Sequence, residues 1–247
     1  GDYEHGGIDS DVSSDRSLIY FNQFNKDKAV DDSKLFKMNW LGELLEEIPT
    51  PFAHHMFDVL PDDSIVYISL DQRSTPEYGN VCGDKIVQRF SDGSEDILFS
   101  TWDHMTVYES ASWNFTLYPF CSDWTHGNFL EWNPERASYL FSMAGTDTIF
   151  ELSEAGEPIQ VLTGLGAFGL NSALQPVTGG FSYPHGPHWN QAGELMLIST
   201  VEEQSRAIAY QINDDHTLEN TWVWGDEYNY RAYNLGEVIE VKDNHRF

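Results

Sequence analysis

Short apolar runs alternate with polar, turn-forming clusters along most of the chain. Runs such as "SLIYF", "SIVYISL", "ELMLIST" and "TWVWG" are rich in β-branched and aromatic residues, and "PDD", "SDG", "NPE" and "NQAG" lie between runs of this kind. Runs of this composition, bounded by turn formers, are typical of antiparallel hairpins. The pattern therefore predicts an all-β protein.

One stretch is ambiguous between helix and strand. The sequence "WLGELLEEI", at residues 40–48, is the best helical candidate in the chain. It follows an apolar run, however, and "LG" near its start is a turn signal, so a strand preceded by a turn fits equally well. Both alternatives remain open at this point.

A hairpin repeats along the chain in a constant frame although its sequence drifts. His55 precedes Asp63 by eight residues, and His185 precedes Gly193 by eight. A later copy, "GEVIEVKDNHRF", has glycine in place of the histidine, and a longer variant, "HGNFLEWNPERASYLFSM", opens at His126. Each copy reads as strand, turn and strand. A fixed spacing of this kind indicates a repeat architecture.

A second pair of short strands follows these hairpins, which makes about four strands per unit. Units of four strands repeated radially form a β-propeller, whose blades place their first strands along a central channel. Histidines that open those strands would converge there. A β-sandwich could use the same strands, but it would not explain the shared histidine frame. We expect one propeller domain over residues 1–247, with the first and last blades incomplete.

Charge excludes several classes of partner. Forty acidic and thirteen basic residues give a formal net charge of −27. This charge repels phosphate backbones and anionic membrane surfaces, so we expect neither a nucleic acid partner nor membrane insertion. The sequence also contains no apolar run of transmembrane length.

The two cysteines leave the redox state open. Cys82 and Cys121 could form one disulfide in an oxidising compartment, or they could be two buried thiols. The sequence does not decide between the disulfide and the two thiols.

Five motifs, in order over residues 18–247, carry a family resemblance. They are "HHMFDVLPDD", "DWTHGN", "FSYPHGPHWNQAGELMLIST", "SRAIAYQI" and "YNLGEVIEVKDNHRF". Together they resemble the PAPS-independent bacterial arylsulfotransferases. The resemblance implies a six-bladed propeller, periplasmic or secreted, that transfers a sulfuryl group from an aryl sulfate to a phenol. It implies no nucleotide cofactor.

The resemblance also implies roles for particular residues. His185 would be the nucleophile that becomes sulfohistidine, and His55, His126 and Asn128 would bind the sulfuryl oxygens or transfer protons. Imidazole suits this chemistry because its unperturbed pKa of about 6.5 leaves a neutral nitrogen near pH 7. The expected ligands are small aryl sulfates and phenols, and either a homo-oligomer or an extracellular assembly is compatible with the sequence.

The surroundings of these histidines have other candidates and other interpretations. Tyr183 and Trp189 flank His185 and could stack on an aryl ring. Three convergent histidines could instead bind a transition metal, but no short His-x-His or Cys/His spacing supports this, so we expect no metal. Each histidine could also be an ordinary hairpin residue that bonds to backbone.

Three positions depart from the family pattern. Ala144 stands where the family has a sulfate-binding arginine, and Met56 and Gly186 follow histidines where relatives carry carboxylates. Arg206 is the nearest candidate to replace the arginine, although a strand-end ion pair is the simpler role for it. These losses support a second hypothesis, in which the protein is a propeller without catalysis that acts as a binding or structural module.

Overall fold

The computed structural model describes residues 9–23, 32–110, 118–166, 169–171, 175–201, 204–225, 236–242 and 245–246. For residues 241–242 and 245–246 it describes the backbone alone. Strands dominate these residues, which confirms the all-β class. Most of the chain forms antiparallel sheets in which strands that are consecutive in sequence are neighbours in space.

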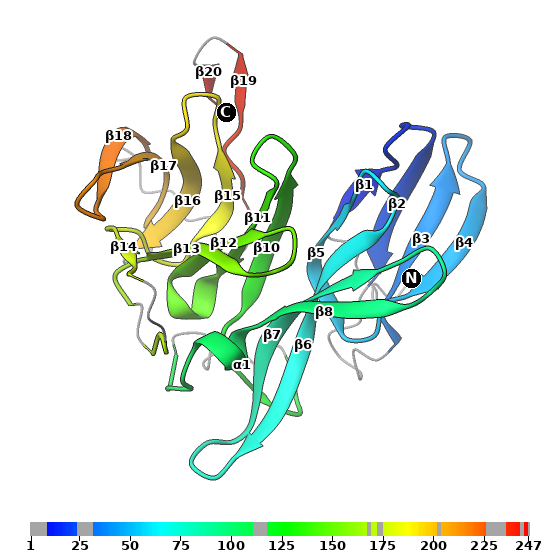
Figure 1. Cartoon of the computed structure of the whole chain (residues 1–247), viewed down its shortest axis with the longest axis horizontal. Coiled ribbons are helices and arrows are strands. Elements are labelled where there is room, and N and C mark those ends of the chain that lie inside the picture. Colours follow the sequence, from blue (N-terminus) through cyan, green and yellow to red (C-terminus); the bar gives the residue numbers. More distant parts are fainter. Residues whose placement is uncertain are drawn as a thin grey trace.

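Four sheets follow one another in chain order (Figure 1). The first contains β1 (Ser10–Val12), β2 (Leu18–Gln23), β3 (Lys34–Asn39) and β4 (Leu44–Pro49). The second contains β5 (Ala53–Val59), β6 (Ile65–Thr75), β7 (Gly79–Arg89) and β8 (Glu95–Ser100), with β9 (Ser122–Asp123) added beside β7. The third contains β10 (Gly127–Asn133), β11 (Ser138–Met143), β12 (Thr148–Ser153), β13 (Pro158–Thr163) and β14 (Val177–Thr178). The fourth contains β15 (His185–Trp189), β16 (Leu195–Val201), β17 (Gln204–Ile212) and β18 (Leu218–Trp224), and a separate hairpin pairs β19 (Glu240–Lys242) with β20 (His245–Arg246).

The predicted hairpin frame is confirmed at its turns. Asp63 and Gly193, eight residues after their histidines, lie in the β5–β6 and β15–β16 turns with φ of +60° and +79°. Residues 40–48 form a turn followed by a strand, not a helix. The apolar run "DILFSTW", residues 96–102, is a strand only in part. The strand ends at Ser100, and Thr101–His104 forms a single helical turn, α1.

Apolar side chains fill the spaces between successive sheets. One buried cluster joins the first and second sheets through residues such as Leu35 and Tyr67. A second joins the second and third sheets, and a third joins the third and fourth through Leu162 and Leu197. Four-stranded meanders that pack face to face in sequence are the blades of a β-propeller, and the first strands β5, β10 and β15 lie beside one another.

Side chains, not a backbone ladder, connect these first strands. Asp11 on β1 accepts a hydrogen bond from Val59 N of β5 at 2.7 Å. Asp58 on β5 accepts one from Trp132 N of β10 at 2.6 Å. Carboxylates can satisfy the backbone N–H groups that a radial arrangement leaves without a ladder partner. This arrangement fixes the lateral spacing of the strands that carry the histidines.

Cys82 and Cys121 form a disulfide with their Cα atoms 5.7 Å apart. The bond fastens β7 to the segment before β9, where Cys82 also pairs with Asp123 in a parallel ladder. Because the bridge closes a loop between positions 39 apart in sequence, we expect its loss to lower the free energy of unfolding by about 3 kcal/mol.

Urea unfolding with and without a reductant measures this contribution. A variant with both cysteines changed to alanine serves as the control, because its midpoint should not respond to the reductant. An equal shift of both proteins would show that the reductant acts elsewhere.

Candidate functional site

The first strands of three blades are irregular at their histidines. The ladders of β5, β10 and β15 each contain a register shift there. His55 and His126 have φ of +55° and +51°, and Gly186, directly after His185, has φ of +55°. A bulge re-aims side chains, and non-glycine residues in the left-handed region cost of order 1–3 kcal/mol and gather at functional sites. The repeated irregularity favours a functional role over that of ordinary hairpin residues.

The re-aimed side chains form a continuous series of aromatic ring contacts. Ring centroids are 5.1 Å apart for His54 and His55, and 5.1 Å apart for His55 and His126. Tyr183 continues the series, 6.2 Å from His126 and 5.5 Å from His185. We call these five residues the histidine cluster. The three predicted histidines and Tyr183 therefore lie together, although they come from three blades.

Asp123 orients and charges His126. Its Oδ2 lies 2.6 Å from His126 Nδ1, and both side chains are buried. Burial by itself lowers the pKa of His126, but the charge and hydrogen bond of Asp123, together with the more distant Asp84, outweigh it and raise the pKa above its usual 6.5. His126 therefore favours the imidazolium form, a positive charge inside the cluster.

A second carboxylate lies behind His54. Asp84 Oδ1 is 2.9 Å from His54 Nε2, and Asp84 Oδ2 accepts hydrogen bonds from Thr125 Oγ1 at 2.6 Å and Gly127 N at 2.5 Å. Burial raises the pKa of Asp84, but the hydrogen bonds and charge of His54 and the donors on the β10 side lower it overall. Asp84 is thus a carboxylate, fully enclosed and held at both oxygens.

His54 connects this carboxylate to His55. The Nδ1 atoms of His54 and His55 are 2.8 Å apart. In a regular strand adjacent side chains point to opposite faces, so this contact depends on the left-handed backbone at His55. Burial, followed by the charges of the neighbouring histidines, lowers the pKa of His55 well below its usual value. His55 is therefore neutral at pH 7.

His185 is a neutral imidazole in a dry environment. Its side chain is 8% exposed, and within the described part of the chain its Nε2 has no hydrogen-bond partner. Burial, and secondarily the charge of His126, lower its pKa to about 4. A neutral imidazole with a nitrogen that bonds to nothing else is suited to act as a nucleophile.

Two polar residues position the segment that leads into His185. Asn128 Nδ2 donates to Pro184 O at 2.8 Å, and Asn128 Oδ1 accepts from Ser142 Oγ at 2.5 Å. Asp147 Oδ1 accepts from Tyr183 N at 2.6 Å. Both ends of the Asn128 amide are therefore engaged within the protein, which gives this residue a structural link to His185 besides the ligand contact predicted for it.

Trp189 and Arg206 lie outside the series of ring contacts. Trp189 is at the far end of β15, about 13 Å along the strand from His185, where it belongs to an inter-sheet core cluster beneath the Arg136 guanidinium. Arg206 lies on β17, two strands from His185 and so about 10 Å away, and donates to Gln204 Oε1 at 3.0 Å. The structure thus gives Trp189 a packing role and does not bring Arg206 into the cluster.

Local geometry explains one departure from the family pattern. A Cβ atom on Gly186 would lie 3.0 Å from Glu237 Cα and 3.0 Å from Gly236 O, and the φ of +55° also disfavours a side chain. A side chain there would therefore require the backbone at residues 236–237 to move by a few tenths of an ångström. Ala144 is buried, and its N–H donates to His126 O at 3.1 Å. The position of the missing arginine thus adjoins His126, which carries the nearby positive charge.

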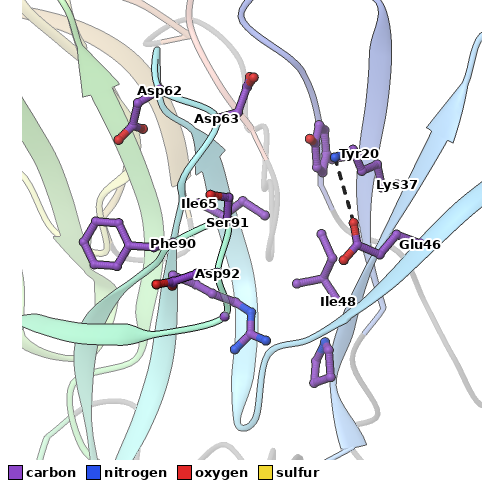
Figure 2. Close-up of a pocket in the computed structure, with 13 residues that line it drawn as sticks. Tyr20, Lys37, Glu46, Ile48, Asp62, Asp63, Ile65, Phe90, Ser91 and Asp92 are labelled. Atoms are coloured by element: carbon purple, nitrogen blue, oxygen red, sulfur yellow. Dashed lines mark ion pairs between the residues drawn. The ribbon is translucent and has the colours of Figure 1, made fainter.

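One cavity lies away from the histidine cluster. It measures about 580 Å³ and is lined by Tyr20, Lys37, Glu46, Asp62 and Asp92 among others, from the first two blades (Figure 2). The Lys37–Glu46 ion pair, at 3.9 Å, lies on its first-blade side. Size alone does not make this cavity the site, because it contains none of the strained histidines and its charges are the ordinary ones of a groove between sheets.

The described residues contain no group of three or more His, Cys, Asp or Glu side chains arranged to hold a metal ion. None of their helices has the length and apolar character that crossing a bilayer requires.

Asp84 and the role of Asp123 are not evident from the sequence. Asp123 lies three residues before His126, and this short spacing is a local signal from which the contact could be predicted. Asp84 is 30 residues from His54, and no pattern connects the two. Only the pairing of β5, β6 and β7 brings them together.

Several solved structures resemble this chain at low sequence identity. They include a nidogen/laminin complex (12% identity, TM-score 0.46, covering 87% of this chain and 62% of that one). A catalytically inactive virginiamycin B lyase from Staphylococcus aureus has 12% identity and TM-score 0.45, covering 92% and 73%. A putative gluconolactonase has 13% identity and TM-score 0.48, covering 90% and 65%. The chain thus spans under two thirds of the length of the first and third of these proteins, and similarity this low carries no functional argument.

The comparison of sequence families is more decisive. A search of curated proteins found no match. The family described as arylsulfotransferase (ASST), however, matches residues 8–245. This range includes all four blades and every member of the histidine cluster. The chain belongs to the arylsulfotransferase family.

Proposed function

We propose that this protein transfers a sulfuryl group from an aryl sulfate to a phenol through a covalent intermediate on His185. The observation that supports this most is the pairing of opposite protonation states in one cluster. His185 is neutral, and among the described residues its Nε2 has no hydrogen-bond partner, whereas His126, linked to it through Tyr183, favours the charged form. A nucleophile and a cation for the sulfuryl oxygens are the two groups that the reaction needs.

In the first step a lone pair on His185 attacks the sulfur of the aryl sulfate. An N–S bond forms, the S–O bond to the aryl group breaks, and the electron pair stays on the aryl oxygen, which leaves as a phenol once it is protonated. In the second step the oxygen of another phenol attacks the same sulfur, the N–S bond breaks, and its electrons return to His185. Two displacements of this kind predict ping-pong kinetics.

His126 takes the electrostatic role that the family arginine would have had. Negative charge on the sulfuryl oxygens must be stabilised in both transition states, and a preorganised donor in a dry site is worth about 10² to 10³ in rate. Asp123 keeps His126 charged, and the protein's net charge of −27 makes a local cation more necessary. Tyr183, between His126 and His185, is placed to contact an aryl ring.

The setting and partners follow from the same proposal. A disulfide between Cys82 and Cys121 supports a periplasmic or secreted protein, because such bonds persist in oxidising compartments. The ligands would be small aryl sulfates and phenols, with no cofactor.

Incubation with 4-nitrophenyl sulfate and a second phenol tests the proposed function. We expect nitrophenol release together with an equivalent amount of sulfated acceptor, and parallel lines in double-reciprocal plots at several acceptor concentrations. Release no faster than in buffer alone, with retained binding of the aryl sulfate, would favour the non-catalytic binding module.

The pH profile of kcat/KM gives a further prediction. We expect the rate to rise as His185 loses its proton near its pKa of about 4, and to fall at higher pH as His126 loses its proton at a pKa above 6.5. The signs follow because His185 must be neutral and His126 charged. Initial rates over a series of buffers measure both limbs. A rate that already declines as the pH falls through 6.5 would show that His185 titrates normally.

A further inference from the structure

His54 and Asp84 have no place in the proposed reaction, yet they are among the most enclosed polar residues of the protein. Both side chains are 1% exposed, and they form an ion pair or hydrogen bond at 2.9 Å. Such burial is costly unless the groups are fully bonded. Asp84 meets this requirement with donors from two segments, whereas His54 uses its second nitrogen to contact His55.

We propose that Asp84, His54 and His55 form a proton relay that protonates the departing phenolate and then accepts the proton of the incoming phenol. This inference rests on the proposed sulfuryl transfer and adds the route of its proton. His55 would be the member that touches substrate. His54 and Asp84 act through it as positioning residues.

The geometry determines which nitrogen holds which proton. Asp84 can only accept, so His54 Nε2 carries a proton. When His54 is neutral, its Nδ1 must accept from His55 Nδ1–H, which leaves a lone pair on His55 Nε2. When His54 is protonated, its Nδ1–H donates to His55 Nδ1, and His55 Nε2 then carries the proton. The contact between the two Nδ1 atoms therefore couples the outer nitrogen of His55 to the charge on His54.

Each half-reaction moves one proton through this contact. As the first S–O bond breaks, His55 Nε2–H is transferred to the aryl oxygen and the Nδ1 proton of His54 passes to His55. The relay ends neutral except for the Asp84 carboxylate. As the second phenol attacks, its O–H proton passes to His55 Nε2 and the His55 Nδ1 proton returns to His54. His54 Nε2–H keeps its hydrogen bond to Asp84 throughout, and no proton is gained or lost over the cycle.

His126 is less suited to this task. Its Nδ1 is bonded to Asp123 and its charged form is favoured, so it has the properties of a fixed cation. His55, the outer member of the relay, contacts both His54 and His126, and so lies between His54 and that cation. The two carboxylate–histidine units thus have separate tasks.

A His54→Gln variant tests the relay. Glutamine can keep a hydrogen bond to Asp84 in place of Nε2 but lacks the nitrogen that faces His55. With phenyl sulfate, whose leaving group needs a proton, we expect the rate of sulfuryl-enzyme formation to fall about 10²-fold, the usual contribution of general acid catalysis. With 4-nitrophenyl sulfate, whose leaving group is stable as the anion, the rate should be nearly unchanged.

Thr125→Val is the matched control. It removes one hydrogen bond to Asp84 without altering either histidine. This variant should lower the free energy of unfolding. It should also change the rate of sulfuryl-enzyme formation by the same small factor with both sulfate donors. This dependence on the leaving group distinguishes a relay from a merely structural role for the buried pair.

The outcomes separate the two proposals. If His54→Gln lowers the rate of sulfuryl-enzyme formation equally with both donors, or with neither, the relay is wrong while sulfuryl transfer stands. If wild-type protein forms no adduct with either donor, the proposed function is wrong and the relay with it. Should His54→Gln fail to fold, wild-type rates in D₂O decide, because the relay requires a solvent isotope effect with phenyl sulfate and almost none with 4-nitrophenyl sulfate.

Discussion

Replacement of His185 by alanine is expected to lower the transfer of sulfuryl groups by about 10⁴-fold or more, because loss of a covalent nucleophile removes both displacements at once. The ring is buried, and within the described part of the chain its Nε2 has no hydrogen-bond partner, which supports the proposed attack on sulfur. Intact-mass measurement after a brief incubation with aryl sulfate should show one added sulfuryl group on the wild type and none on His185→Ala. Peptide mapping at high pH then locates it.

His216→Asn provides the matched control for this experiment. His216 is exposed in the β17–β18 turn with φ of +61°, a conformation that asparagine tolerates. This variant should retain both adduct formation and turnover. An adduct of undiminished amount on His185→Ala would show that another residue is the nucleophile.

Replacement of Asp123 by asparagine is expected to lower kcat by about 10³-fold, the scale of one lost preorganised electrostatic group. Asparagine nearly preserves the shape of the side chain but carries no charge. Since Asp123 contributes most to raising the pKa of His126 against the effect of burial, we expect the imidazolium to be lost at neutral pH. The descending limb of the pH profile should therefore move to lower pH. The ascending limb near pH 4, which belongs to His185, should stay in place.

Asp92→Asn makes the same chemical change at an exposed turn, where the carboxylate accepts from Ser94 N and Oγ. It should leave both rate and profile unchanged. A lower rate in Asp123→Asn with an unmoved descending limb would mean that Asp123 only braces the hairpin and that the cation is another group.

Much of the fold could be predicted from local patterns. Strands and turns depend on residue types that are neighbours in sequence, so "SIVYISL" and "ELMLIST" are strands, and the eight-residue frame places Asp63 and Gly193 in turns. The ambiguity at residues 40–48 could not be resolved in this way. There a strand formed because it extends the first sheet beside β3.

The candidate site could be predicted in part. The repeat frame brings His55, His126 and His185 to neighbouring first strands, and the contacts between β5, β10 and β15 agree with it. Trp189 and Arg206 are candidates because they are close to His185 in sequence or in the repeat frame. Along β15, however, four residues span about 13 Å, and β17 is two strands away from the first strand, so sequence proximity did not become spatial proximity.

The sequence by itself determined the all-β class, the order of the hairpins and the set of histidines, because each depends on residue type and spacing along the chain. Only the tertiary structure decided the chemistry of those histidines. Their protonation depends on burial and on carboxylates that arrive from other strands. Asp84 reaches His54 across 30 residues, and the left-handed backbone at His55 turns two adjacent rings toward each other. A pKa responds to the surrounding dielectric and charge, and these exist only once the blades have packed.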